Sequence, residues 1–293
     1  MYKEISEKLE QYLLLKGKEY LNIIKNDYSS FMNEEQKDLL DSLLNSNFIK
    51  VEENSNKLKE LWQNKNFSIP LAHGGRTFED NIIHFYPFDY LERMNKKEII
   101  TNDSETIFNY LSKQCEIVLI HELFHYFIRP TYSTNANFQE YNSYTTEGLV
   151  DLITRDFQIR NNINNNYSSE YYQNVIFLRQ ILNNINSYED KMKLIFQGSI
   201  EKIYYDTNTN PTEISQYINK DLDNLLSEIV NIVTTSYPHS KETITRALYN
   251  LYANYDKEED FFNTLLKITK ETFPNLFQEI SENINNYTNN LTI

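Results

Sequence analysis

Apolar residues recur at intervals of three and four over much of the chain, which predicts amphipathic helices. In residues 1–63 the recurring positions are Leu9, Tyr12, Leu13, Tyr20, Leu21 and Ile24, then Leu39, Leu40, Leu43 and Leu44. Similar stripes predict helices over about 169–185, 188–204, 211–234 and 258–293. The fold is therefore expected to be mainly helical.

The pattern changes between residues 66 and 87, where strand-forming residues replace the helical spacing. Gly74 and Gly75 fall together in this segment, which predicts a hairpin or loop leading into a strand over 81–86. Pro87 has no backbone N–H to donate, so this strand must end there or lie at the edge of a sheet. We expect one small sheet beside the helices.

A helix is predicted to begin near Ser104 or Glu105, after a cluster of N-cap residues, and to run to about Phe127. It contains the sequence His121-Glu122-x-x-His125. Histidines four residues apart lie about 40° apart around a helix, so both rings can bind one metal ion. A carboxylate at Glu122 can then take the proton of an attacking water as general base.

A second helix is expected to begin at an N-cap formed by Thr145 or Thr146 and to end near Arg160. Glu147 then falls in its first turn. Catalytic zinc takes three protein ligands and leaves a fourth position open, and two His with one Glu is a common set. Glu147 is the candidate third ligand, and Asp151 could accept the free ring N–H of a ligating histidine.

Together these residues resemble the gluzincin metallopeptidases, the clan of thermolysin, the M1 aminopeptidases and the clostridial neurotoxin light chains. The resemblance covers about residues 117–156 and rests on His121, Glu122, His125, Glu147 and Asp151. It implies that His121, His125 and Glu147 bind zinc, that Glu122 is the general base, and that Asp151 orients a histidine. It also implies a substrate backbone that pairs along the strand preceding the metal-binding helix.

The resemblance implies an α+β fold, mainly α-helical, with a zincin-like catalytic domain, a small edge-stranded sheet and a helical C-terminal subdomain. The domains expected are a helical lead-in over 1–65, the catalytic core over 66–205, and a C-terminal subdomain over 206–293 that completes the cleft. The expected activity is zinc-dependent hydrolysis of peptide bonds. Endopeptidase action is favoured because no motif for an acidic amine-binding pocket is found.

Peptide hydrolysis on zinc also needs a donor for the developing oxyanion, and a Tyr, His or Arg side chain commonly supplies it. The candidates are Tyr237, His239, Arg246 and Tyr249, which surround the start of a predicted helix. The neurotoxin light chains use an Arg and a Tyr in this role, and thermolysin a His and a Tyr. The alternative is that these residues only cover a helix surface.

The charge of the chain narrows the class of partner. Its 28 Lys and Arg against 42 Asp and Glu give a net charge of −14, which argues against nucleic acid or an anionic membrane as a partner. A peptide or protein substrate is compatible with this charge. The oligomeric state does not follow from the sequence.

Cysteine content and the N-terminus bear on the compartment. Cys115 is the only cysteine, so no intrachain disulfide forms. The charged N-terminus lacks the apolar core of a signal peptide, and no apolar run reaches transmembrane length. These features favour a cytoplasmic protein, with an exported mature or leaderless form as the alternative.

Two other functions are compatible with the same residues. A regulatory protease could cleave one cytosolic partner and leave generic peptides intact. A non-catalytic helical interaction protein could use His121 and His125 only to complete its core, because His-Glu-x-x-His also arises by chance. Bound metal would distinguish the last of these from the other readings.

Overall fold

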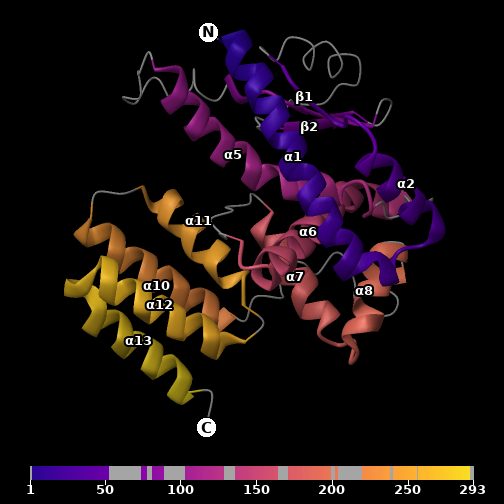
Figure 1. Cartoon of the computed structure of the whole chain (residues 1–293). Coiled ribbons are helices and arrows are strands. Elements are labelled where there is room, and N and C mark those ends of the chain that lie inside the picture. The colour runs from indigo at the N-terminus through magenta and orange to yellow at the C-terminus, as the bar shows by residue number, and fades with distance from the viewer. Residues whose placement is uncertain are drawn as a thin grey trace. The chain divides into compact units, whose positions relative to one another are not determined.

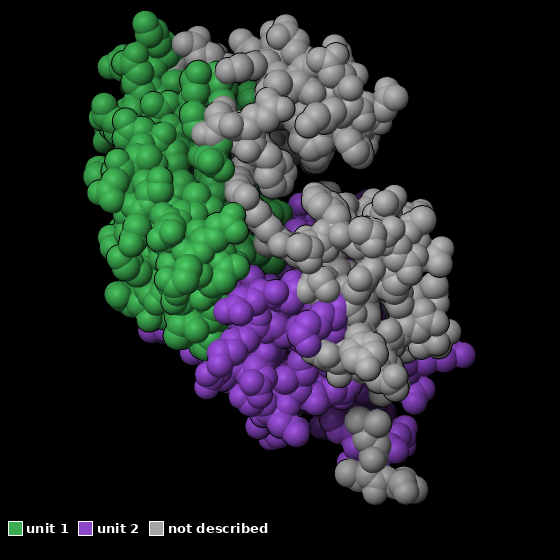
Figure 2. All heavy atoms as spheres, turned by 90° about the vertical axis from the view of Figure 1, so that its right-hand side faces the viewer, with its two compact units in different colours: residues 1–129 green, residues 130–293 purple. Residues whose placement is uncertain are grey.

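A computed structural model describes residues 2–52, 74–77, 81–88, 103–128, 136–163, 171–198, 202–203, 220–237, 240–255 and 257–290. The described chain is mainly helical with one small sheet, as the sequence predicts. It divides into two compact units, residues 1–129 and 130–293, which Figure 2 shows in separate colours. None of the described helices is long and apolar enough to cross a membrane.

The first unit begins with two predicted helices, α1 (Tyr2–Tyr28) and α2 (Glu34–Leu44), with the short 3₁₀ helix η1 (Ser29–Phe31) between them. Asn33 and Gln36 form a capping box that starts α2. The apolar stripe of α1 is buried as expected, with Leu9, Leu13 and Leu21 fully inaccessible. Both helices therefore form where the spacing of apolar residues predicts them.

Among the described residues the sheet has three strands in the order β1-β3-β2, namely β1 (Ile49–Val51), β3 (Ile82–Phe85) and β2 (Gly74–Thr77). β1 runs parallel to β3, and β2 runs antiparallel to it. Strand β1 lies in a segment predicted to be helical, although the alternating burial of Ile49, Lys50 and Val51 is a strand pattern.

One expectation about this sheet is confirmed and one is wrong. β2 and β3 pair antiparallel, so the predicted hairpin arrangement is present, with the two glycines within β2 opposite Phe85 and His84. However, β3 is the central strand and has a neighbour on each side, so a substrate cannot add to it as a further strand. The free edges of a sheet in this order belong to β1 and β2.

Helix α5 (Ser104–Phe124) completes the described part of the first unit and packs against both α1 and β2. It begins where the sequence predicts, because the Asp103 side chain accepts hydrogen bonds from the backbone N–H groups of Glu105 and Thr106. Two tyrosine hydroxyls of α1, those of Tyr12 and Tyr20, donate to the carboxylate of Glu116. These bonds fix α5 against α1, and Figure 1 shows the two helices side by side.

The second unit is wholly helical in its described residues. Its elements are α6 (Ala136–Arg160), α7 (Tyr172–Leu182), α8 (Tyr188–Gln197), α10 (Lys220–Ser236), α11 (Lys241–Tyr252), α12 (Glu258–Thr272), the 3₁₀ helix η4 (Pro274–Leu276) and α13 (Phe277–Asn290). α6 packs on α7, and α10 packs on both α11 and α13. The predicted helices of this half are present where the structure describes them, although α8 ends at Gln197, within the predicted range 188–204.

The start of α6 differs from the prediction. The helix begins at Ala136, so neither Thr145 nor Thr146 is an N-cap, and Glu147 lies near the middle of the helix. The tyrosines, serine and asparagines of residues 136–144 suggested a loop, but they continue the helix that follows. Propensity over such a short stretch is a weak signal that the packing of a long helix overrides.

The two units meet in sequence at Arg129 and Pro130, within the predicted catalytic core of 66–205. The residues of the predicted lead-in belong to the same compact unit as the sheet and α5. The predicted boundaries at 65 and 205 stay predictions. Trp62, the only tryptophan of the chain, lies outside the described residues.

Candidate metal centre

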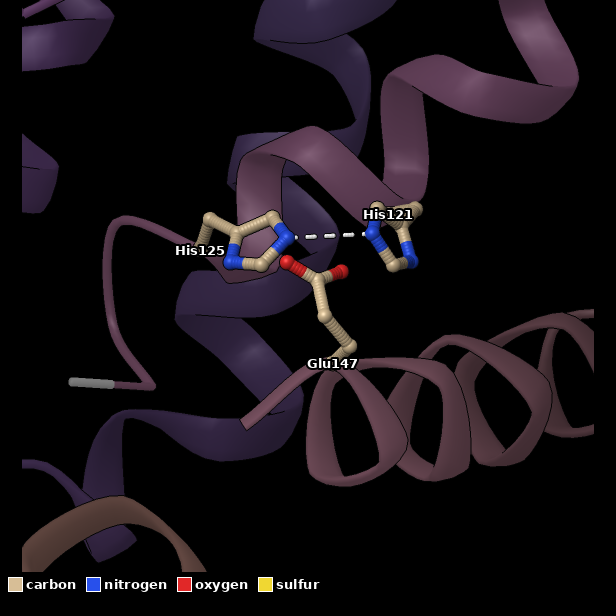
Figure 3. Close-up of side chains that lie close together, drawn as sticks. All are labelled: His121, His125 and Glu147. Carbon is tan, nitrogen blue, oxygen red and sulfur yellow. Dashed lines mark hydrogen bonds between the residues drawn. The ribbon is translucent and has the colours of Figure 1, made fainter. Parts of the chain in front are cut away.

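The end of helix α5 presents His121 and His125. α5 ends at Phe124, and His125 follows as its C-cap in a helical conformation, with its backbone N–H bonded to the carbonyl of His121. The last helical turn is thus kept through both histidines. Their Nε2 atoms lie 3.0 Å apart and face one another, as Figure 3 shows. His121 is 5 % exposed and His125 is half-buried.

Several contacts within the first unit hold this turn. The Tyr126 hydroxyl donates to the carbonyl of Asn81 at 2.6 Å, and the Gln36 side-chain amide donates to the carbonyl of Phe127 at 2.6 Å. The ring of Phe124 meets the ring of Tyr28 edge to face, with centroids 5.6 Å apart. Helices α1 and α2 and the start of β3 therefore all restrain the backbone that carries His125.

Glu147 of α6 completes a group of three possible metal ligands. One ligand atom from each of His121, His125 and Glu147 can be chosen so that all three lie within 4.8 Å of one another. Figure 3 shows the Glu147 carboxylate pointing toward the two facing imidazole nitrogens. Among the described residues, this is the only group of three or more His, Cys, Asp or Glu side chains placed so that they could hold a metal ion.

The geometry of the two histidines fits zinc. Tetrahedral zinc with Zn–N bonds of about 2.0–2.1 Å places two nitrogen ligands roughly 3.3 Å apart. The observed Nε2 separation of 3.0 Å is close to that value. Without a metal, two imidazole nitrogens at this distance can only share one proton, since two lone pairs or two N–H groups would repel. The donor set of two imidazoles and a carboxylate is one that catalytic zinc accepts.

Glu122 lies between the two histidines in sequence and is 8 % exposed. No hydrogen bond or ion pair joins it to another residue within the described part of the chain. A buried carboxylate is costly unless it is paired, because its charge loses hydration. A buried carboxylate that has no partner among the described residues, beside two possible metal ligands, is an arrangement that suits a general base.

Helix α6 places Glu147 through the packing around Gly148. A Cβ built on Gly148 would lie 2.7 Å from Cβ of Asn174 and 2.9 Å from Cδ1 of Leu178, so α6 and α7 approach too closely there for any larger residue. Asp151, predicted to orient a histidine, is completely buried one turn after Glu147. Its predicted role as a partner of a ligand stays a prediction.

The buried polar stripe of α6 continues beyond Asp151, and the sequence interpretation missed it. Thr154, Arg155 and Gln158 have no exposed surface and lie within about 100° of Glu147 around the helix. The guanidinium of Arg155 donates to the backbone carbonyl and side-chain oxygen of Asn250, at 3.2 and 2.7 Å, and to the side chain of Asn254. Polar residues at intervals of three and four in an otherwise apolar helix were the available signal.

The structure describes three of the four candidate oxyanion donors, and their side chains have different neighbours. His239 lies outside the described residues. The ring of Tyr237 packs on Phe273, with centroids 4.8 Å apart. The Tyr249 hydroxyl donates to Asp223, and burial followed by this bond raises the pKa of Tyr249 well above its ordinary value. Arg246 lines a cavity with Tyr172.

His84 and Cys115 could each have been considered as a metal ligand or catalytic group, but both side chains are buried in the core. His84 is 2 % exposed, and its Nδ1 lies 3.0 Å from Oε1 of Glu52. Cys115 is 1 % exposed, and burial raises the pKa of its thiol to about 12. Both observations agree with packing roles for these side chains.

Known proteins give no independent assignment of this site. Comparison of the chain with protein-family models, with curated proteins and with solved structures finds no match.

Proposed function

We propose that the protein is a zinc-dependent metallopeptidase that hydrolyses peptide bonds with water. The observation that carries this proposal is the convergence of His121, His125 and Glu147 beside a buried Glu122 that has no partner among the described residues. If the His-Glu-x-x-His sequence had arisen by chance, there would be no reason for a carboxylate from another helix, that of Glu147, to lie beside the two histidines. The resemblance to the gluzincin pattern supports the same activity.

In this proposal His121, His125 and Glu147 hold the zinc ion. Zinc bound by such a set polarises the scissile carbonyl and lowers the pKa of a water molecule. Glu122 takes a proton from the attacking water and passes it to the leaving amine. The burial of Glu122 keeps bulk water from competing for that proton.

Endopeptidase action is the form we propose, and its substrate would bind in an extended conformation. We propose that the substrate binds along the free edge of β2. The free edge of β1 is partly covered, because the Glu10 carboxylate accepts a hydrogen bond from the backbone N–H of Val51 at 3.0 Å. No strand pairs with the outer side of β2 in the described part of the chain. Extended peptides commonly bind by adding a strand to such an edge.

A digest of a proteome-derived peptide mixture tests the activity, with new termini identified by mass spectrometry. The wild type should generate cleavages that disappear in Glu122→Gln. Glu105→Gln is the matched control, because Glu105 is an exposed carboxylate in the first turn of the same helix. Equal cleavage by wild type and Glu122→Gln would refute the proposed activity.

A further inference from the structure

The turn that follows helix α5 carries His125 and is tighter than the helix itself. The backbone N–H of Tyr126 donates to the carbonyl of Leu123 at 3.2 Å. The N–H of Phe127 donates to the carbonyl of Phe124 at 3.0 Å, which is the same three-residue, 3₁₀ spacing. A terminal turn opens more readily than a helix interior, because its last carbonyls have no helical partners. A metal ligand on such a turn needs support from elsewhere in the fold.

Tyr126 provides one such support. Its side chain is 1 % exposed, and its hydroxyl donates to the backbone carbonyl of Asn81 at 2.6 Å. Asn81 directly precedes β3 and has a φ of 55°, in the left-handed region that asparagine adopts more readily than most residues. The ring of Tyr126 also meets the ring of Phe48 edge to face, with centroids 6.5 Å apart. A phenylalanine in its place would keep the ring contact and lose the hydrogen bond to the sheet.

Gln36 of helix α2 provides the second support. Its Oε1 accepts from the backbone N–H of Asn33 at 2.8 Å, and its Nε2 donates to the carbonyl of Phe127 at 2.6 Å. The side-chain amide is thus held at both ends. It gives the carbonyl of Phe127 a donor at the point where the helical hydrogen bonds of α5 end. The two supports therefore act on the two residues that directly follow His125.

We infer that Tyr126 and Gln36 are positioning residues for the metal ligand His125. They act through the backbone that follows the ligand, because a fixed backbone fixes the direction of the imidazole. A tight site needs its ligands within about 0.5 Å of their required positions, and the two facing Nε2 atoms lie 3.0 Å apart. The inference rests on the proposed zinc site, and it adds two residues that contribute no ligand atom to it.

The affinity for zinc tests the inference, measured on the purified chain by competition with a chromophoric chelator. Tyr126→Phe and Gln36→Glu should each weaken zinc binding about tenfold, the lower end of the range for residues that orient metal ligands. Gln36→Glu keeps an acceptor for the capping box, where Glu and Gln are both common, but loses the amide donor. Since Gln36 is half-buried at the start of α2, this variant also serves if Tyr126→Phe does not fold.

Cobalt(II) gives a readout that a simple loss of stability would not change. When it replaces zinc, its visible absorption bands report the number and arrangement of its ligands. The wild type should give the intense bands of a four-coordinate ion. Tyr126→Phe and Gln36→Glu should give weaker or shifted bands at saturating cobalt, because the imidazole of His125 is no longer held in one direction.

Each variant has a matched control in the first unit. Tyr20→Phe also removes a tyrosine hydroxyl that anchors α5, but that hydroxyl bonds Glu116, more than one helical turn before His121. Gln11→Glu adds the same charge as Gln36→Glu at an exposed position of α1. Both controls should keep the zinc affinity and the cobalt spectrum of the wild type, even where the melting temperature falls.

Two outcomes would overturn the inference alone. Tyr126→Phe and Gln36→Glu could both keep the zinc affinity and cobalt spectrum of the wild type. Tyr20→Phe could also lose as much affinity as Tyr126→Phe, which would mean that any loosening of α5 weakens the site. A wild type that binds zinc as described but cleaves no peptide would refute the peptidase and leave the positioning role in place. A wild type that binds no zinc would refute both.

Discussion

Helices α5 and α6 supply the three proposed zinc ligands, and they bury their surfaces in opposite ways. The buried face of α5 is apolar around His121 and Glu122, with Leu119, Ile120 and Leu123 almost inaccessible. α6 buries a polar stripe that begins at Asp151, one turn after the half-buried Glu147, and includes Arg155. The histidines are therefore placed by one helical turn, whereas the carboxylate depends on a polar network and on close packing with neighbouring helices.

The largest expected effect concerns the buried carboxylate of α5. Glu122→Gln keeps the size of the side chain but removes the base, so turnover should fall by about a thousandfold. Zinc content should stay at the wild-type level because the ligands are untouched. Steady-state cleavage of the best peptide and metal analysis measure the two quantities, and a variant that retains a tenth of wild-type activity would contradict the assignment.

Arg155 tests the polar stripe of α6. Replacing it with Met should lower the free energy of unfolding by about 2–4 kcal/mol, because Asn250 and Asn254 lose buried hydrogen bonds. The affinity for zinc should also fall if the stripe positions Glu147. Urea denaturation and a zinc titration report the two effects.

The control for Arg155 is Arg160→Met on the same helix, where the side chain is exposed, pairs with Asp156 and lies over the ring of Tyr188. Its effect on unfolding should stay within about 0.5 kcal/mol. If the two variants were equally stable, the buried network would have no energetic role.

Gly148→Ala compares helix propensity with packing. Propensity alone predicts a gain of about 1 kcal/mol, since alanine is the better helix former. The contacts with Asn174 and Leu178 predict a loss of about 1–3 kcal/mol, because a methyl group would force α6 and α7 apart. Thermal unfolding gives the sign, and a raised melting temperature would show that the interface yields easily.

Cys115 provides the smallest expected effect. With its pKa raised to about 12 by burial, roughly one thiol in a thousand is ionised at pH 9 in the folded protein. Alkylation by iodoacetamide should therefore be very slow at pH 9 in the native state and fast in urea. Rapid reaction of the native protein would mean that the α5 core opens readily.

The features that could be predicted from the sequence differ from the rest in the same way as α5 differs from α6. The spacing of His121 and His125 and the cap at Asp103 involve residues within a few positions of each other, so local rules were sufficient for α5. The true start of α6, the central position of β3 and the pairing of Gly74 and Gly75 depend on partners distant in the chain. Local spacing carries no information about those partners.

The surroundings of Arg246 and Tyr249 were not predicted for a similar reason. Arg246 and Tyr249 were considered as catalytic donors because of their spacing on one helix. Their surroundings come from Tyr172 on α7 and Asp223 on α10, which only the fold brings to them. The Asp223 bond gives the Tyr249 hydroxyl a partner that an oxyanion role would have to displace.

The most direct test is the metal content of the purified chain, measured by mass spectrometry for wild type, His121→Ala, Glu147→Ala and the control Glu105→Gln. The account predicts one zinc per wild-type and control chain, and a loss or sharp reduction of zinc in both ligand variants. A wild type that binds no zinc after reconstitution would contradict it and leave His121 and His125 as residues of a helical core.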